Sequence, residues 1–236
     1  MSLPIYAHRG ASAYALENTM EAFQKALKLG ANGIELDVQC SKDGQLIVFH
    51  DNNIKRLTGV NRLVQDCSLE ELQSYRLGKR FSRIFSTKHM PKLHDIIEWA
   101  NKENVALNIE LKESLMTNQD ALIQLLKTIR LPAHSHFSSF YEQLLIIVKK
   151  HCPHIETAFL VTKKFDWTKL GKLSHIDTIH AHKKYYKRNY LKACEYAGKN
   201  IRFYSITGKE SFIAQPHPSV VGWITDYPDI VAKNSI

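Results

Sequence analysis

Short apolar runs of the β type alternate along the chain with segments whose apolar residues recur every three or four positions. The first such pair is residues 5–7 followed by residues 18–29, where Phe23 and Leu27 lie on one face of the predicted helix. Gly30 follows that helix, as is typical of a helix C-terminus. The same alternation continues to the end of the chain and indicates repeated parallel βα units.

The later predicted strands share a composition rich in β-branched and other apolar side chains, and the later helices share an apolar stripe. The strands are residues 33–38, 46–49, 105–111, 135–138, 156–161, 178–181, 201–206 and 220–225. The helices are residues 68–75, 94–104, 118–129, 141–150, 167–172 and 189–197. In the first of these helices, Ser68 and Glu71 are spaced as a capping box.

About eight strands, most of them separated by helices, favour a TIM (β/α)8 barrel. A barrel of this kind takes about 250 residues, close to the 236 present, whereas a doubly wound sheet uses five or six strands. Residues 51–93 do not follow the alternation, and we interpret them as an insertion with one short helix. We therefore expect residues 1–236 to form a single barrel domain that carries an insertion at about 51–93.

Composition narrows the class of protein further. With 44% hydrophobic and 23% charged residues, the chain is neither disordered nor collagen-like. The longest aliphatic run, residues 144–148, is far shorter than the roughly 20 residues of a membrane helix, and no secretory signal is visible. The four cysteines show no CxxC spacing, which is typical of reduced thiols. We expect a cytoplasmic protein without stable membrane insertion.

The net charge of +9 is unevenly distributed. Residues 1–118 carry 15 Lys and Arg against 14 Asp and Glu, whereas residues 119–236 carry 17 against nine. Such a surplus can attract nucleic acid, an anionic membrane or a phosphorylated substrate, and it can equally be a solvated basic surface. The basic and aromatic residues 183–188 could stack single-stranded nucleic acid, but an exposed loop is the simpler interpretation. We expect no nucleic-acid partner.

Carboxylates occur within two of the predicted strands. Glu35 and Asp37 alternate with apolar residues and so share one face of their strand, as Glu110 and Lys112 do in theirs. If the apolar faces pack against the helices, the three carboxylates point into the barrel and suit a hard divalent cation such as Ca²⁺ or Mg²⁺. The alternative is that each carboxylate is neutralised by a neighbouring Lys or Arg.

Histidines and cations follow the predicted strands at their C-terminal ends. His8 and His50 can serve as a general acid and base, because imidazole titrates near neutral pH; alternatively, each is a hydrogen-bonded structural residue. Arg9 offers a planar fork and Lys112 a compact charge for the oxygens of a phosphodiester. Together with a metal, these groups would stabilise the transition state of phosphodiester cleavage.

Seven short motifs resemble the glycerophosphodiester phosphodiesterase family, in its bacterial cytosolic type. They are His8-Arg9-Gly10, Leu16-Glu17-Asn18-Thr19, residues 30–38, Lys42-Asp43-Gly44, Phe49-His50-Asp51, residues 108–112 and residues 224–228. The resemblance spans nearly the whole chain. It implies a TIM barrel with a small insertion after the second barrel strand, and cleavage of a small-molecule glycerophosphodiester into glycerol 3-phosphate and an alcohol.

The resemblance also implies a role for each matching residue. The metal would be held by Glu35, Asp37 and Glu110, and the acid–base pair would be His8 and His50. The phosphate would be contacted by Arg9 and Lys112, and the site would be supported by Glu17 and Asn18. Residues 204–207 depart from the usual family pattern, which leaves the preferred head group open.

Two other functions remain open. Lysophospholipids could be cleaved on the same barrel, with the lipid entering under the insertion. Apolar residues there could line its path or form a small core of their own; they are Leu72, Tyr75, Leu77, Phe81, Ile84 and Phe85. A barrel that binds anions or nucleic acid without catalysis is the third possibility, although no catalytic position of the motifs is missing.

Overall fold

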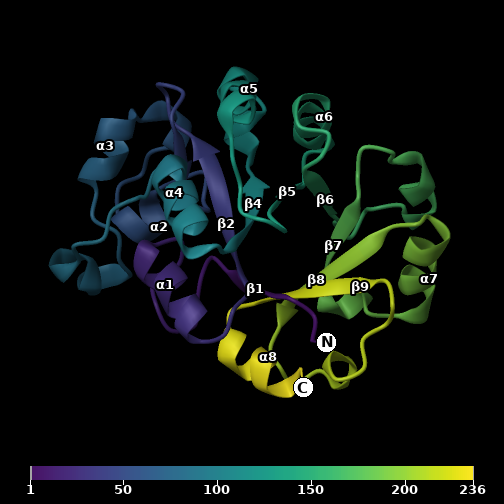
Figure 1. Ribbon diagram of the computed structural model, residues 1–236. Coiled ribbons are helices and arrows are strands. Elements are labelled where there is room, and N and C mark those ends of the chain that lie inside the picture. The colour runs from purple at the N-terminus through teal and green to yellow at the C-terminus, as the bar shows by residue number, and fades with distance from the viewer. Residues whose placement is uncertain (1, 236) are drawn as a thin grey trace.

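Parallel strands form a closed barrel at the centre of the molecule. The computed structural model describes residues 2–235. The barrel strands are β1 (Ile5–His8), β2 (Gly33–Cys40), β4 (Ala106–Leu111), β5 (His136–Ser139), β6 (Glu156–Leu160), β7 (Thr178–His182), β8 (Asn200–Ile206) and β9 (Val220–Thr225). The barrel closes because β1 pairs in parallel with both β2 and β9 (Figure 1). The predicted TIM barrel is confirmed.

One predicted strand lies outside this barrel. Strand β3 (Leu46–Val48) runs antiparallel to β2, with Val38 opposite Val48. The connection formed by residues 41–45 explains this, because a parallel crossover needs a dozen or more residues. The second and third predicted strands are therefore a hairpin, and the insertion follows that hairpin.

Helices cover the outside of the barrel (Figure 1). They are α1 (Met20–Lys28), α4 (Leu93–Glu103), α5 (Gln119–Thr128), α6 (Glu142–His151), α7 (Arg188–Tyr196) and α8 (Pro228–Asn234). Shorter 3-10 turns are Val64–Asp66, Arg80–Phe85, Glu113–Leu115, Trp167–Lys172, Lys183–Tyr185 and Ser211–Ile213. The helix predicted at residues 167–172 is thus a 3-10 helix.

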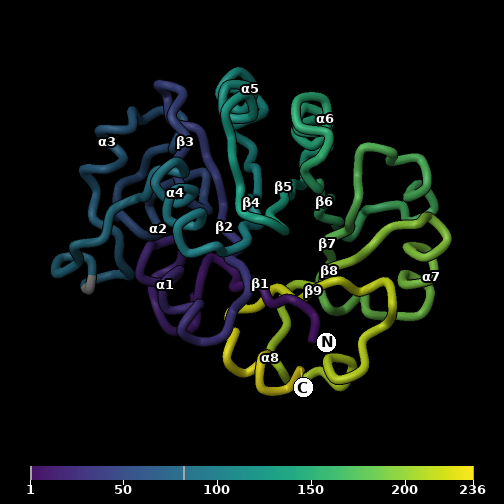
Figure 2. The backbone as a smooth tube through the Cα atoms, viewed as in Figure 1, coloured from purple at the N-terminus to yellow at the C-terminus, as the bar shows by residue number. Residues whose placement is uncertain are grey.

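The insertion has its own apolar core. It contains α2 (Lys55–Thr58) and α3 (Leu69–Ser74), and it forms the lobe at the left of Figure 2. The predicted capping box is present at α3, where the Ser68 side chain accepts from the Glu71 backbone N–H and the Glu71 side chain accepts from that of Ser68. This core consists of Ile47 and Phe49, which precede the insertion, and of Ile54, Leu57, Val64, Cys67, Leu72, Leu77 and Met90 within it.

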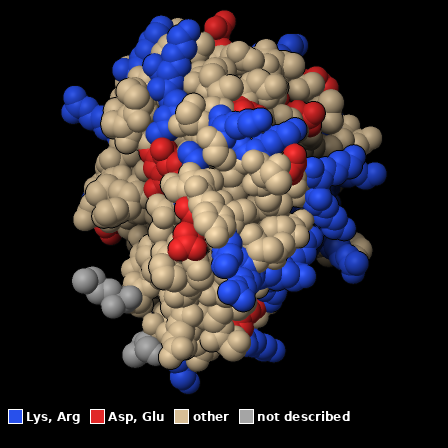
Figure 3. All heavy atoms as spheres, turned by 90° about the vertical axis from the view of Figure 1, so that its right-hand side faces the viewer, with Lys and Arg blue, Asp and Glu red and all other residues tan. Residues whose placement is uncertain are grey.

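The outer surface differs in charge between the two halves of the chain. Figure 3 shows more Lys and Arg than Asp and Glu on the face that forms the right-hand side of Figure 1, where α7 lies. Within residues 2–235, no helix is both long enough and apolar enough to cross a membrane.

Candidate active site

Three carboxylates meet inside the barrel at the C-terminal ends of two adjacent strands. Glu35 and Asp37 extend from β2, and Glu110 extends from β4 directly opposite Asp37. Their relative exposures are 3%, 1% and 9%, and one oxygen from each lies within 4.8 Å of the others. The apolar neighbours on β2 pack outwards against the helices, as the alternation predicts.

The charges of these carboxylates perturb one another. Burial, followed by repulsion from Asp37, raises the pKa of Glu35 and raises that of Glu110 to about 7. Burial opposes ionisation of Asp37 as well, but Lys112 and Arg9 outweigh it and lower the pKa of Asp37 to about 2. A divalent cation would favour the ionised form of all three groups, so this donor set fits Ca²⁺ or Mg²⁺.

Two cations pair with the cluster without fully neutralising it. Lys112 Nζ lies 2.6 Å from Glu110 Oε1 and 3.0 Å from Asp37 Oδ1. Arg9 Nε lies 3.2 Å from Asp37 Oδ2. The ion pairs considered from the sequence therefore exist at Asp37 and Glu110, whereas neither cationic side chain pairs with Glu35. Three carboxylates held this close together fit a bound divalent cation.

The loop after β1 adopts a special backbone conformation at the site. Arg9 has a φ of +55° and its backbone N–H donates to Glu35 Oε2 at 2.8 Å. Asn18, with a φ of +54°, donates its side-chain N–H to Asp37 Oδ2 at 2.8 Å. Left-handed conformations at residues other than glycine cost energy and tend to occur at functional sites. Here they place two donors on the carboxylates.

Each of the two histidines is hydrogen-bonded to a different aspartate. His8 Nδ1 lies 2.7 Å from Asp226 Oδ1, and His50 Nδ1 lies 2.7 Å from Asp51 Oδ1. Within residues 2–235, Nε2 of both rings is left without a hydrogen-bond partner, so it can exchange a proton. Burial disfavours the protonated form of His8, but the negative charges of Glu35 and Asp226 raise its pKa to about 9.

A chain of ion pairs links Glu17 to Asp51, which is the partner of His50. Glu17 accepts from Arg9 Nη1 at 2.8 Å and from both terminal nitrogens of Arg56 at 2.7 Å. Arg56 Nε also donates to Asp51 at 2.6 Å. Arg56 belongs to α2 of the insertion and had no sequence signal, whereas Asp51 stands next to His50 in a motif.

A cavity of about 240 Å³ brings these groups together at the C-terminal ends of the strands. Its lining residues are His8, Arg9, Glu35, His50, Asn108, Glu110, Lys112, Ser138, Phe140, Leu160, His180, Tyr204, Ser205 and Ile224. Asp37, Glu17 and Asn18 are not among the lining residues, but Asp37 and Glu17 contact Arg9, which is one of them. In (β/α)8 barrels this end of the strands carries the catalytic residues. The fold and the site are those of a TIM-barrel enzyme.

Comparison with known proteins identifies the family of this enzyme. The model of the glycerophosphoryl diester phosphodiesterase family matches residues 8–230. The chain belongs to this family, and it is an enzyme of the phosphodiesterase class.

Relatives and solved structures agree with this assignment. A glycerophosphodiester phosphodiesterase of Caldanaerobacter subterraneus is 36% identical over 163 residues, which cover 68% of this chain and 67% of that protein. The protein YhdW of Bacillus subtilis is 30% identical over 98% of this chain and 97% of its own length. An Oleispira antarctica phosphodiesterase, solved in complex with the product sn-glycerol-3-phosphate, is 27% identical with a TM-score of 0.84; the match covers 98% of this chain and 96% of that one.

Proposed function

We propose that this enzyme hydrolyses water-soluble glycerophosphodiesters to glycerol 3-phosphate and an alcohol, with a divalent cation, Ca²⁺ or Mg²⁺, in the cytoplasm. The observation that carries the proposal is the pair of histidine–aspartate contacts on either side of one carboxylate cluster. Two imidazoles with free Nε2 atoms can give and take a proton in one reaction.

The acid–base chemistry follows from the two histidines. One imidazole takes the proton from the attacking oxygen, which is that of water or of the 2-hydroxyl of the substrate, as that oxygen forms its bond to phosphorus. The other imidazole gives a proton to the alcohol oxygen as its bond to phosphorus breaks. Asp226 and Asp51 hold the two rings in orientation through Nδ1. If the 2-hydroxyl of the substrate is the attacking group, the first step leaves a cyclic phosphate. Water then opens this cyclic phosphate in a second step.

The metal and the cations would act on the phosphate. Glu35, Asp37 and Glu110 would hold the metal, which supplies a Lewis acid for a phosphate oxygen. Arg9 and Lys112 line the cavity and would bind the other phosphate oxygens. Glu17 keeps Arg9 in position, and Asn18 does the same for Asp37.

A lysophospholipid is the second candidate substrate. Three of the apolar residues proposed to admit a lipid are exposed: Phe81, Ile84 and Phe85. Leu72 and Leu77 are instead buried in the core of the insertion. Leu72 and Leu77 thus belong to a small core, and the three exposed side chains are the ones that could contact a lipid.

A coupled assay for glycerol 3-phosphate tests the proposal. We expect release from several glycerophosphodiesters, activation by Ca²⁺ or Mg²⁺ and loss after chelation. Glu35→Gln should abolish turnover, and His8→Asn or His50→Asn should lower kcat by about 10²-fold or more. Lysophosphatidylcholine as substrate separates the second candidate from the first.

The matched control is Glu98→Gln, because Glu98 is an exposed carboxylate that pairs with His94 on α4. Without added Ca²⁺ or Mg²⁺, all variants should keep the melting temperature of the wild type within a few degrees. Full activity of Glu35→Gln, or equal loss in Glu98→Gln, would contradict the proposed metal site.

A further inference from the structure

Residues 76–88 of the insertion expose apolar side chains at their tip. In the 3-10 helix Arg80–Phe85, the relative exposures are 82% for Phe81, 63% for Ile84 and 87% for Phe85. Large apolar side chains exposed together on a globular protein mark a surface that meets a partner or a membrane. The apolar tip is therefore a candidate docking surface.

The charged residues within this segment of the chain are all basic. Between Glu71 and Asp95 the sequence has no acidic residue. It has six basic residues there: Arg76, Lys79, Arg80, Arg83, Lys88 and Lys92. Arg76 donates to the backbone carbonyl of Ile84 and not to a carboxylate, whereas Lys88 pairs with Glu21 at 2.9 Å. The segment thus combines exposed aromatic rings with a positive field.

The base of the segment is anchored. Leu77 is buried, and its backbone N–H donates to the Lys88 carbonyl at 2.7 Å. The Gly78 N–H donates to the Leu57 carbonyl at 2.9 Å. The Arg83 guanidinium lies against Gly59, where an added Cβ would come within 2.6 Å of it. The exposed rings are consequently presented on a backbone held at both ends.

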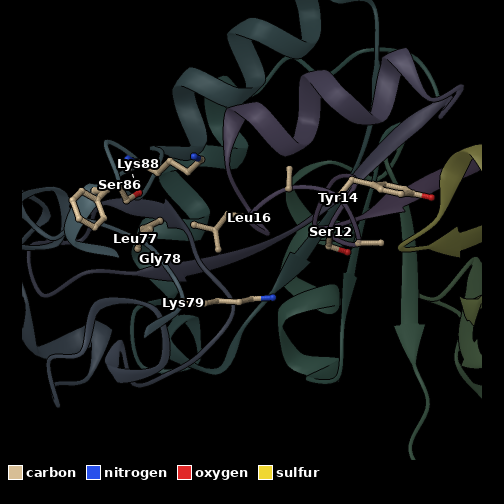
Figure 4. Close-up of a pocket in the computed structure, with 11 residues that line it drawn as sticks. Ser12, Tyr14, Leu16, Leu77, Gly78, Lys79, Ser86 and Lys88 are labelled. Carbon is tan, nitrogen blue, oxygen red and sulfur yellow. Dashed lines mark hydrogen bonds between the residues drawn. The ribbon is translucent and has the colours of Figure 1, made fainter. Parts of the chain in front are cut away.

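A groove of about 430 Å³ separates the segment from the loop that follows β1. Figure 4 shows Leu77, Gly78 and Ser86 on one side of it and Ser12 and Tyr14 on the other. Ser12 also donates its hydroxyl to Asp226 at 2.7 Å, and Asp226 is the partner of His8. The segment therefore lies beside a loop that belongs to the active site.

We propose that residues 76–88 are a docking surface for an anionic phospholipid bilayer. Phe81, Ile84 and Phe85 would enter the boundary between headgroups and acyl chains, and the Lys and Arg residues would face anionic headgroups. Burial of apolar area together with attraction of basic residues is the combination that binds a protein to such a surface. A second copy of the chain would bring two positively charged surfaces together, which disfavours that occupant. The proposal does not depend on the proposed reaction.

Sedimentation of the full chain with vesicles tests this surface. We expect binding to phosphatidylcholine vesicles that contain about one third phosphatidylglycerol, and much weaker binding to pure phosphatidylcholine or at about 0.5 M NaCl. The double variant Phe81→Ser with Phe85→Ser should lower the partition coefficient by about tenfold or more. Its hydrolysis of a soluble glycerophosphodiester should stay at the wild-type rate, since neither ring lines the active-site cavity.

The matched control is Tyr196→Ser, because Tyr196 is 84% exposed on α7. Its binding should equal that of the wild type. Three results would overturn the proposal: no binding to the anionic vesicles at low salt, an equal loss in Tyr196→Ser, or a dimer in sedimentation velocity that the double variant dissolves. Binding to single-stranded nucleic acid that the double variant alone abolishes, without vesicle binding, would also overturn it.

Discussion

At the scale of single residues, the site depends on contacts between groups far apart in the sequence. His8 and Asp226 are separated by 218 positions, and their side chains meet because β1 and β9 are neighbours in the closed barrel. Ser12 donates a second hydrogen bond to the same Asp226 oxygen. The carboxylate therefore holds the ring of His8 from a fixed position.

Replacing Asp226 by Asn tests this positioning. We expect kcat for a glycerophosphodiester to fall by roughly 10–100-fold with KM nearly unchanged, because the orientation and tautomer of His8 are no longer imposed. Steady-state kinetics would measure both constants. Asp229→Asn is the control, since Asp229 bonds only to the exposed Tyr14 hydroxyl in the described part of the chain. Wild-type kcat in Asp226→Asn would contradict the role.

The residues of the site could be predicted where strand alternation and motif agreed. Glu35, Asp37 and Glu110 lie together as their places on the two strands predict. Arg56 could not be predicted in this way, because its contacts with Glu17 and Asp51 arise from the path of the insertion and no local pattern encodes them.

At the scale of elements, the turn after β1 brings the chain close to α1. Gly10 has a φ of +81°, and a Cβ on it would lie 2.7 Å from backbone and side-chain atoms of Ala22. A side chain there would face both a strained conformation and a clash with backbone that cannot move aside. The turn carries Arg9 to the carboxylates, so the position of this loop depends on the contact with α1.

The Gly10→Ala variant should lose more stability than the positive φ of residue 10 alone would cost. Gly44→Ala is the matched control, because Gly44 has a φ of +76° with no atom within 4 Å of an added Cβ. We expect Gly44→Ala to cost about 1 kcal/mol, and Gly10→Ala to cost about 2–4 kcal/mol because the clash is added. Urea denaturation would measure both. Equal losses in the free energy of unfolding would show that the close approach to α1 adds nothing to the cost of the substitution.

A second element-scale feature is the turn between β8 and β9. Glu210 accepts from Lys183 Nζ at 2.5 Å and from the backbone N–H groups of Thr207 and Gly208. Burial disfavours its ionisation, but the contacts with Lys183 and Thr207 outweigh it and lower its pKa to about 2. The ionised carboxylate therefore joins this turn to the segment that follows β7.

The stability that Glu210 contributes should depend on pH. Because its folded pKa lies below the ordinary value of 4.5, the contribution is complete above that value and disappears as pH falls towards about 2. Glu210→Gln should be less stable than the wild type at pH 7, and the difference should narrow below about pH 5. Urea denaturation at a series of pH values would measure it. A difference that is constant or grows on acidification would contradict the linkage.

Helices with a clear apolar stripe could be predicted to within two residues, as α4 and α6 demonstrate. The apolar stripe is set by the local sequence, and it is the same face of the helix that packs against the barrel. The segments where prediction was wrong are those decided by connection length or by irregular packing. Leu46–Val48 pairs back on β2, and Trp167–Lys172 winds as a 3-10 helix.

At the scale of the whole molecule, the excess charge and the chemistry occupy different regions. The carboxylate cluster lies between β2 and β4 of the first half, whereas most of the surplus Lys and Arg belong to residues 119–236. The barrel could be predicted from the number and alternation of its elements. The insertion's docking surface could not, because only the structure separates its exposed apolar residues from its core.

Metal binding should stabilise the whole fold. If Ca²⁺ or Mg²⁺ binds the native carboxylate cluster and not the unfolded chain, a large excess over Kd adds about 3 kcal/mol of stability. For a chain of this length we expect the melting temperature to rise by about 5 °C or more, and a chelator to reverse the rise. Thermal unfolding with and without each ion would measure it. A double variant, Glu35→Gln with Glu110→Gln, should show no rise, and a rise equal to that of the wild type would place the ion elsewhere.

The most direct test of the central claim is the identity of the products. Purified enzyme with Mg²⁺ or Ca²⁺ would be mixed with glycerophosphocholine and followed by phosphorus NMR. We expect the diester signal to be replaced by that of glycerol 3-phosphate, with choline released, and the Glu35→Gln variant to leave the diester intact. Formation of phosphocholine and glycerol, or a diester signal that persists with either ion across the soluble head groups, would contradict it.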